Sequence, residues 1–297
     1  MVRAVVRRLR LYGGLLMFGH SVFSLPFALA AMLYASGGRP GWRTFLLVTA
    51  AFLGARNAAN ALNRFIDRRI DAENPRTSGR HIPAGAVWPF EALLLAGFFG
   101  LMLLVSAWFL PPLCLRLLPV AAALMLLYSF TKRFTWLCHL VLGVTSAAAS
   151  VGGWIAVTGT IQWPCLVLAA ANAAWVTGFD LIYQCLDAEH DRKAGLHSVP
   201  ADFGTGTALV LSALCHAAAL GFLAVFGALV AQGAAFWIGL AVLLALLALE
   251  QAAARRSGPE ETRPRRILFS AYTVNQVIGP AFLAFSLIDL YLTGVPA

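Results

Sequence analysis

The chain alternates between long apolar segments and short polar connections. Nine apolar segments each approach the roughly 20 residues that a helix needs to cross a bilayer. They cover residues 12–36, 44–65, 88–110, 112–130, 137–159, 163–186, 207–230, 234–253 and 268–292. The pattern predicts an all-α polytopic membrane protein with nine transmembrane helices, in which residues 1–297 form a single transmembrane domain.

The composition agrees with a membrane protein. Hydrophobic residues make up 60% of the chain and charged residues 12%, which excludes an ordinary soluble domain. The N-terminus is basic, but the apolar stretch over 11–35 is too long for a cleavable signal. The five cysteines are dispersed and form no CxxC pair, so neither a disulfide framework nor a zinc site is predicted.

The net charge is +9, and its distribution indicates membrane topology rather than nucleic-acid binding. With nine spans, nearly all Lys and Arg fall at helix ends on one side, whereas Arg39, Arg43 and Arg116 fall on the other. Cytoplasmic loops carry the excess of Lys and Arg. The N-terminus and the two acidic loops that follow the second and sixth segments are therefore predicted to be cytoplasmic, in a cell inner or plasma membrane.

Two acidic runs stand where the second and sixth segments end. The first contains Asn63, Asp67 and Asp71, with Arg56 seven residues earlier; the second contains Asp180, Gln184, Asp187 and Asp191, with Tyr183 beside them. Because residues at i and i+4 share one helix face, each run is predicted to form one polar stripe on a helix.

The loops after the two runs echo each other weakly, at residues 79–83 and 195–200. This suggests an internal duplication: two four-helix pseudo-repeats plus a final helix around a central cavity, with the site between the repeats.

The two runs together predict a metal-dependent diphosphate site. Facing carboxylates repel one another unless a cation lies between them. Oxygen donors without cysteine or clustered histidine favour Mg²⁺ or Mn²⁺, and Mg²⁺ often shares its ligands with a substrate phosphate. The predicted metal ligands are Asn63, Asp67, Asp71, Asp187 and Asp191, and nearby cations suited to a diphosphate are Arg76, Arg80, Lys132, Arg133, Arg192 and Lys193.

These residues resemble the UbiA superfamily of intramembrane aromatic prenyltransferases. That family carries an NxxxDxxxD motif after its second helix and a DxxxD motif after its sixth. Here the motifs are Asn63–Asp67–Asp71 and Asp187–Asp191, and further matches over most of the chain are Arg56, Arg76, Arg80, Tyr128, Lys132, Arg133, Asp180 and Tyr183. The resemblance implies a nine-helix fold with a central cavity, Mg²⁺ as cofactor, and transfer of a polyprenyl group from polyprenyl diphosphate to an aromatic ring.

The resemblance also implies roles for individual residues. The four motif aspartates bind metal and diphosphate with Asn63 orienting them, and Arg76, Arg80, Lys132, Arg133 and Lys193, together with Tyr128, bind substrate. Asp180 and Tyr183 line the same wall and position the acceptor or the allyl cation. Arg56 holds the carboxylate of a small aromatic acid through two parallel hydrogen bonds.

The sequence leaves the acceptor open. Arg64 stands where an Asp often follows the motif Asn, and residues 20–27 and 63–77 look more like the "UbiA-like" branch. That branch is often labelled 4-hydroxybenzoate polyprenyltransferase, and some members are tied to menaquinone made by the futalosine route. The acceptor is thus expected to be 4-hydroxybenzoate or a dihydroxynaphthoate, in ubiquinone or menaquinone biosynthesis.

Two other functions were weighed. A membrane transporter with intramembrane carboxylates usually has its site near the bilayer midplane on broken helices, whereas these acids lie at helix ends. A CDP-alcohol-type phosphotransferase needs Gly and Ala-Arg between its aspartate pairs, a pattern absent here. Structural roles also stay open: Arg56 as partner of Asp67 or Asn60, and Lys132 and Arg133 as topology anchors. His20, His139 and His216 lie singly in apolar stretches and are expected to be packing or hydrogen-bonded core residues.

Overall fold

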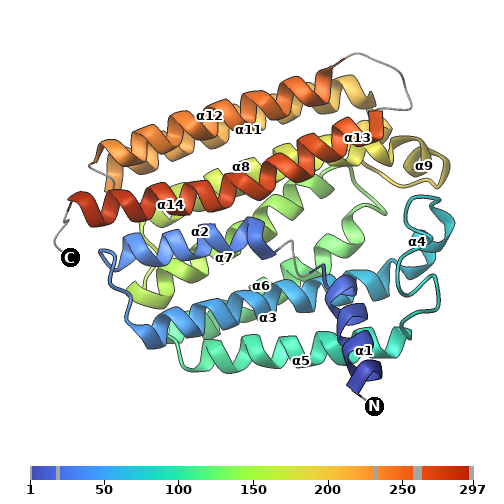
Figure 1. The fold of residues 1–297 in the computed structure, drawn as a ribbon, viewed down its shortest axis with the longest axis horizontal. Helices are drawn as coiled ribbons and strands as arrows, with labels where there is room; N and C mark the ends of the chain where they lie inside the picture. The colour runs from blue at the N-terminus through green and yellow to red at the C-terminus, as the bar shows by residue number, and fades with distance from the viewer. Residues whose placement is uncertain (1, 18–20, 231–232, 257–262, 294–297) are drawn as a thin grey trace.

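Long helices form a single bundle in the computed structural model, which describes residues 2–17, 21–230, 233–256 and 263–293. The long helices are α2 (Ser21–Ala35), α3 (Trp42–Ile66), α5 (Pro89–Trp108), α6 (Pro112–Thr131), α7 (Cys138–Thr158), α8 (Trp163–Tyr183), α11 (Gly204–Val230), α12 (Ala234–Arg255) and α14 (Asn275–Thr293). They run along one common direction, and α1 (Val2–Leu15) lies at an angle to them (Figure 1).

The remaining elements are short and cluster at one end of the bundle. They are α4 (Arg68–Glu73), the 3₁₀ turn η2 (Gln184–Leu186), α9 (Ala188–Lys193), α10 (Val199–Asp202), α13 (Arg263–Leu268) and the π-helical segment η4 (Phe269–Val274). Within the described ranges the chain contains helices, turns and coil, as the apolar pattern predicts.

Among the described residues, eight helices are long and apolar enough to cross a membrane, and α2 adds a shorter apolar helix beside them. The predicted first segment, 12–36, is wrong as a single helix. α1 ends at Leu15 and α2 begins at Ser21, while residues 18–20 lie outside the described ranges. The backbone turns at Met17, whose φ of 50° is left-handed and cannot continue a right-handed helix.

Small residues let the helices approach closely. A Cβ on Gly54 of α3 would lie 2.7 Å from the backbone nitrogen of Leu103 on α5, and a Cβ on Gly153 of α7 would lie 2.2 Å from the carbonyl oxygen of Ala28 on α2. Close backbone approach at glycines is a common way to pack helices in lipid, where tight van der Waals contact replaces the hydrophobic drive.

The packing follows the predicted two halves in one respect. α3 lies along α5 in the first half, and α8 lies along α11 in the second. α2 packs between α7 and α14, where Phe27 stacks on Trp175 and Phe282 with ring centroids 4.9 and 4.7 Å away. The duplication itself remains a prediction from the two loops.

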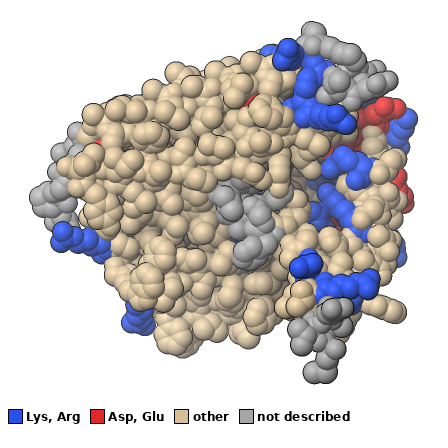
Figure 2. Space-filling view, in the orientation of Figure 1, with Lys and Arg blue, Asp and Glu red and all other residues tan. Residues whose placement is uncertain are grey.

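Charged residues gather at the end of the bundle where α3 and α8 terminate. Figure 2 shows Lys, Arg, Asp and Glu concentrated there, with a wide uncharged surface along the length of the helices. Large apolar side chains within the helices are exposed, among them Phe98 and Leu101 of α5 and Leu214 of α11, which are 63%, 58% and 61% exposed. An apolar belt of this kind fits a lipid environment.

Candidate active site

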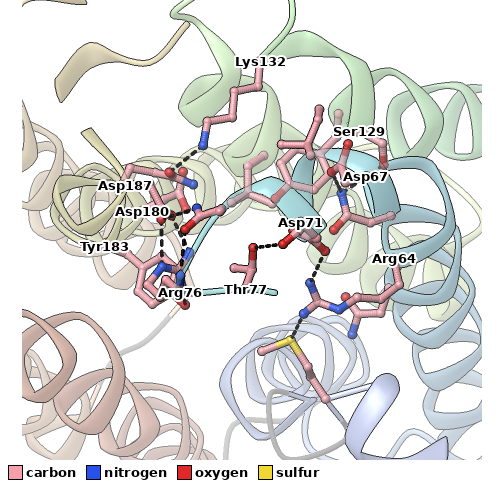
Figure 3. A pocket seen from close by; sticks show the side chains of 18 of the residues that line it. Arg64, Asp67, Asp71, Arg76, Thr77, Ser129, Lys132, Asp180, Tyr183 and Asp187 are labelled. Carbon is pink, nitrogen blue, oxygen red and sulfur yellow. Dashed lines mark hydrogen bonds and ion pairs between the residues drawn. The ribbon is translucent and has the colours of Figure 1, made fainter. Parts of the chain in front are cut away.

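A cavity of about 230 Å³ opens at the charged end of the bundle. Its walls come from α3, α4, the loop after α4, the end of α6, and α8 with the loop that follows it. Asp67 and Asp71 approach from one side, and Asp180, Tyr183 and Asp187 face them from the other (Figure 3).

The first motif is held by a break in the helix rather than by one continuous helix. α3 ends at Ile66, and Asp67 (φ −89°, ψ 5°) joins it to the short α4. The Asn63 amide donates to the Asp67 carboxylate at 2.7 Å, and Arg133 donates to its other oxygen at 3.1 Å. The predicted single stripe is therefore wrong in detail, although Asn63, Asp67 and Asp71 all line the cavity.

Asp71 is buried at the floor of this half of the site. Arg80 pairs with its Oδ1 at 2.5 Å, and the Thr77 hydroxyl donates to its backbone carbonyl at 2.9 Å. Its Oδ2 is buried without a hydrogen bond, 3.8 Å from the guanidinium of Arg64. One carboxylate oxygen thus remains free to take a ligand.

The second motif is interrupted in the same way. α8 ends at Tyr183, η2 follows, and Asp187 (φ −104°, ψ −1°) leads into α9. The second stripe is therefore not carried by one continuous helix, although Asp180, Gln184, Asp187 and Asp191 all line the cavity. Lys132 pairs with Asp191 at 2.7 Å, and the Ser198 hydroxyl donates to the same carboxylate at 3.2 Å.

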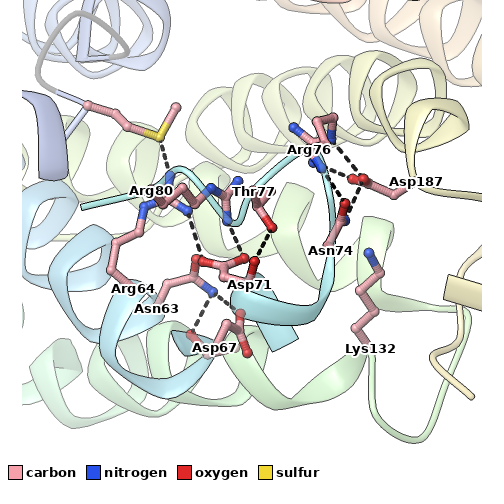
Figure 4. A network of polar contacts seen from close by, with 12 residues as sticks. Asn63, Arg64, Asp67, Asp71, Asn74, Arg76, Thr77, Arg80, Lys132 and Asp187 are labelled. Atoms are coloured by element: carbon pink, nitrogen blue, oxygen red, sulfur yellow. Dashed lines mark hydrogen bonds and ion pairs between the residues drawn. The ribbon is translucent and has the colours of Figure 1, made fainter. Parts of the chain in front are cut away.

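Arg76 joins the loop after the first motif to the second motif (Figure 4). Its guanidinium donates to both oxygens of Asp187, with Nε to Oδ1 at 2.8 Å, and to the Tyr183 hydroxyl at 3.0 Å. It also lies over the Tyr183 ring, 5.3 Å from the centroid. Asn74 donates to Asp187 at 3.0 Å. The two motifs are thus parts of one polar network.

The protonation of the motif aspartates follows from burial and these partners. Burial raises the pKa of Asp67, and hydrogen bonds from Arg133 and Asn63 offset the rise only in part. Burial likewise raises the pKa of Asp191 despite Lys132. Burial acts in the same direction on Asp187, but the Arg76 and Asn74 hydrogen bonds outweigh it and bring the pKa of Asp187 below its usual value. Asp187 is therefore the most firmly ionised of the three.

Arg56, Tyr128 and Asp180 also line the cavity. Arg56 lies well inside α3, away from the charged end, whereas Tyr128 and Asp180 lie in the last turns of α6 and α8. The Nε of Arg56 is buried with no hydrogen bond. Asp67, weighed as its partner, pairs with Arg133 instead, and Asn60 donates to the carbonyl of Leu16 at 2.7 Å. Neither Asp67 nor Asn60 forms a hydrogen bond or ion pair with Arg56 among the described residues.

Lys193 is the exception among the predicted site residues. Its ammonium lies 2.7 Å from Glu189, and the two side chains are 74% and 80% exposed on the outer surface of α9. Lys193 is absent from the cavity lining, as is Arg192, which donates to the Ala201 carbonyl at 3.1 Å. We therefore do not assign either residue to substrate.

The structure adds residues that the sequence reasoning missed. Asn74 donates to Asp187, and Thr77 donates to the backbone carbonyl of Asp71. Arg64 and Ser129 line the cavity, and His139 is hydrogen bonded to Asp180. Asn74 precedes a proline in a polar loop, a common turn pattern, and so carries no distinct signal. His139 was expected to be a hydrogen-bonded or packing residue of the core, and it is buried and hydrogen bonded.

The donor set fits Mg²⁺. Within the described residues, no three Asp, Glu, His or Cys side chains form a ready-made metal cluster, but Mg²⁺ commonly binds one or two carboxylates together with water and substrate phosphates. Carboxylates from both motifs face the same cavity, and Oδ2 of Asp71 is buried without a hydrogen bond. Asp67, Asp71, Asp187 and Asp191 are the residues that would hold the ion, with Asn63 orienting Asp67.

A bundle of membrane-spanning helices with an acid-lined and base-lined cavity at one end defines an integral membrane protein with an enzyme-like site. The sequence places it further: residues 24–275 match the UbiA prenyltransferase family, and the chain belongs to that family. It is therefore a prenyltransferase of the membrane, and the transporter and phosphotransferase alternatives are set aside.

Known relatives cover most of the chain. A 4-hydroxybenzoate octaprenyltransferase from Azotobacter vinelandii is 32% identical over 264 residues, 87% of this chain and 85% of that protein. One from Neisseria meningitidis serogroup B is 33% identical over 253 residues, 84% and 82% of the two chains.

Solved structures share the fold. The apo structure of a UbiA homolog from Aeropyrum pernix K1 has a TM-score of 0.81 and 31% identity, covering 91% of this chain and 98% of that chain. A UbiA homolog from Archaeoglobus fulgidus, bound to GPP and Mg²⁺, has a TM-score of 0.72 and 20% identity, covering 95% and 99%.

Proposed function

We propose that this protein transfers a polyprenyl group from a polyprenyl diphosphate to a ring carbon of 4-hydroxybenzoate, with Mg²⁺ as cofactor. The observation that carries the proposal is the convergence of two aspartate motifs and their paired cations on one cavity. The acceptor is chosen because the relatives from A. vinelandii and N. meningitidis are named 4-hydroxybenzoate octaprenyltransferases. Such an enzyme would serve ubiquinone biosynthesis.

The diphosphate end of the substrate would lie among the motif residues. Arg76, Arg80, Lys132 and Arg133 each pair with a motif aspartate and also line the cavity. A guanidinium can donate to an aspartate and a phosphate oxygen at once, since it carries five N–H groups. Bound Mg²⁺ would neutralise charge on the departing diphosphate and so favour cleavage of the allylic C–O bond.

The acceptor would lie further along α3. Arg56 precedes Asn63 by seven residues, about 10 Å along the helix axis. Its buried Nε lacks a hydrogen bond. The carboxylate of a bound acceptor would accept that hydrogen bond and would itself gain a donor in the buried site. Leu142, Val176 and Phe179 line the cavity as well and offer an apolar surface to the aromatic ring and the allylic carbons.

The two tyrosines lie where positive charge would develop. Tyr128 and Tyr183 line the cavity on α6 and α8. Aromatic faces stabilise nearby cations, and the Tyr183 ring already carries the Arg76 guanidinium over its face. Tyr183 is thus well placed beside the carbon that loses the diphosphate.

We also propose that the charged end of the bundle faces the cytoplasm of a cell inner membrane. The excess of Lys and Arg at this end follows the positive-inside rule. Both substrates fit that placement, since a small aromatic acid would reach the cavity from water and a polyprenyl tail from lipid.

The test is direct. Purified protein in lipid nanodiscs is incubated with Mg²⁺, a polyprenyl diphosphate and either 4-hydroxybenzoate or 1,4-dihydroxy-2-naphthoate, and prenylated ring and released diphosphate are measured. We expect prenylated 4-hydroxybenzoate, loss of turnover with EDTA, and loss in Asp67→Asn and Asp187→Asn but not in Lys193→Ala. Prenylation of the naphthoate alone would overturn the acceptor, and failure with both would overturn the proposed reaction.

A further inference from the structure

His139 on α7 connects the cavity to the start of α10. Its Nδ1 lies 2.7 Å from Oδ2 of Asp180 on α8, and its Nε2 lies 3.2 Å from the backbone nitrogen of Val199. His139 is 1% exposed and Asp180 7% exposed. A buried imidazole with a partner on each nitrogen is held in one orientation.

The partners assign the proton on the ring. The backbone N–H of Val199 can only donate, so Nε2 must be the acceptor. A neutral imidazole with Nε2 unprotonated carries its proton on Nδ1. His139 therefore donates from Nδ1 to Oδ2 of Asp180, and this hydrogen bond is charge-assisted when Asp180 is ionised.

Asp180 differs from the four motif aspartates in its partners. Asp67, Asp71, Asp187 and Asp191 each form an ion pair with Lys or Arg. In the part of the chain that the structure describes, Asp180 pairs with His139 alone, through Oδ2. Asp180 lines the cavity next to Tyr183, so its Oδ1 is a carboxylate oxygen not committed to a protein cation.

We propose that Asp180 accepts the proton that leaves the acceptor ring and that His139 is the positioning residue that aims it; this rests on the proposed prenyl transfer. The C–O bond of the polyprenyl diphosphate breaks, and its electron pair leaves with diphosphate. A ring π pair forms the new C–C bond to the allylic carbon. The C–H pair at that ring carbon then restores aromaticity, and the proton goes to Oδ1 of Asp180.

His139 performs this role without changing its own protonation. Its donation to Oδ2 fixes the carboxylate plane and keeps that oxygen occupied, so that Oδ1 is the atom presented to the cavity. Its acceptance from Val199 ties the same ring to the residue after Ser198, whose hydroxyl donates to Asp191. The position of the base is thereby linked to that of the diphosphate site.

Two substitutions separate the two contacts of His139. The amide nitrogen of an asparagine reaches roughly the position of Nδ1, so His139→Asn keeps a donor for Asp180 and loses the contact with Val199. The amide of a glutamine reaches roughly the position of Nε2, so His139→Gln keeps an acceptor for Val199 and loses the donor to Asp180.

The measurements are kcat and acceptor KM with 4-hydroxybenzoate and with its ring-deuterated form, at saturating Mg²⁺ and polyprenyl diphosphate. We expect His139→Asn to stay within about threefold of wild type, and His139→Gln to lose about 10²-fold in kcat, the low end for losing general-base catalysis. Acceptor KM should change little, and a ring-deuterium isotope effect should appear in His139→Gln because proton removal has become rate-limiting.

The comparison of His139→Asn with His139→Gln decides whether His139 positions Asp180. Equal losses in the two variants, or a loss in His139→Gln without an isotope effect, would assign His139 a structural role and overturn the proposal. Should neither variant fold, as judged by its melting temperature, Asp180→Asn decides: the same kcat loss and isotope effect support the proposal, and wild-type turnover overturns it. Failure of the wild type to prenylate any acceptor would instead reject the proposed function itself.

Discussion

Arg56 gives the sharpest test of where the acceptor lies, because the two interpretations of this residue predict opposite effects on stability. A structural arginine stabilises the fold through its partners. A binding arginine stands ready for a ligand and lacks them. The buried Nε of Arg56 has no hydrogen bond, and the structure pairs its guanidinium with no carboxylate among the described residues. We therefore consider Arg56→Met, which keeps much of the apolar stem and removes the charge.

The expected magnitudes follow from those contacts. A buried donor without a partner costs about 1–3 kcal/mol, so Arg56→Met should raise the melting temperature by roughly 2–4 °C for each kcal/mol recovered. The acceptor should lose at least one charge-assisted hydrogen bond of about 1.5–3 kcal/mol, which corresponds to a rise in KM of about 10- to 150-fold.

The assay compares 4-hydroxybenzoate with 4-hydroxybenzyl alcohol, which keeps the phenol and lacks the carboxylate. Arg56→Met should raise KM for the acid and leave KM for the alcohol unchanged. Arg116→Met, on α6 outside the cavity lining, is the matched control and should change neither. A lower melting temperature together with an unchanged KM for the acid would refute the assignment and make Arg56 a structural residue.

Two further predictions concern the bridge between the motifs and the helix packing. Arg76→Lys keeps the charge but cannot bind both oxygens of Asp187, so KM for polyprenyl diphosphate should rise about tenfold. The rise is modest because the Arg76 side chain is 31% exposed. The KM of the control Lys193→Ala should stay at the wild-type value, and an unchanged KM in Arg76→Lys would argue against the bridge. Gly54→Ala places a Cβ 2.7 Å from the backbone of Leu103 and should cost about 1–3 kcal/mol in unfolding free energy. Gly97→Ala, whose Cβ meets nothing within 4 Å, is its control, and equal melting temperatures would contradict the close approach of α3 and α5.

The apolar pattern predicted the helices well because each span is fixed locally by length and hydropathy. α6 is predicted as 112–130 and observed as Pro112–Thr131, and α8 begins at Trp163 as predicted. Prolines beside these positions mark both helix starts. The prediction missed the break before α2 because 12–36 is mostly apolar and contains no Lys, Arg, Asp or Glu. Hydropathy does not record that the backbone turns at Met17.

The spacing of the acidic runs identified the cavity residues, but for a partly mistaken reason. A period of four predicts one continuous helix, whereas each run crosses a helix end at Asp67 or Asp187. The side chains still converge because both helices end at the same end of the bundle, on opposite sides of one cavity. Contacts such as Arg76 with Asp187, 111 residues apart, depend on tertiary structure and have no local signature.

The charge balance of the cavity bears on the proposed role of a divalent ion. Five aspartates line it, Asp67, Asp71, Asp180, Asp187 and Asp191, against six basic residues, Arg56, Arg64, Arg76, Arg80, Lys132 and Arg133. The lining is thus close to neutral, and the cations at its mouth are already paired. A diphosphate, which carries several negative charges, would meet both repelling carboxylates and attracting guanidinium groups. Protein cations alone would therefore attract it only weakly, and divalent cations bound with the substrate would turn the carboxylates from repelling groups into ligands.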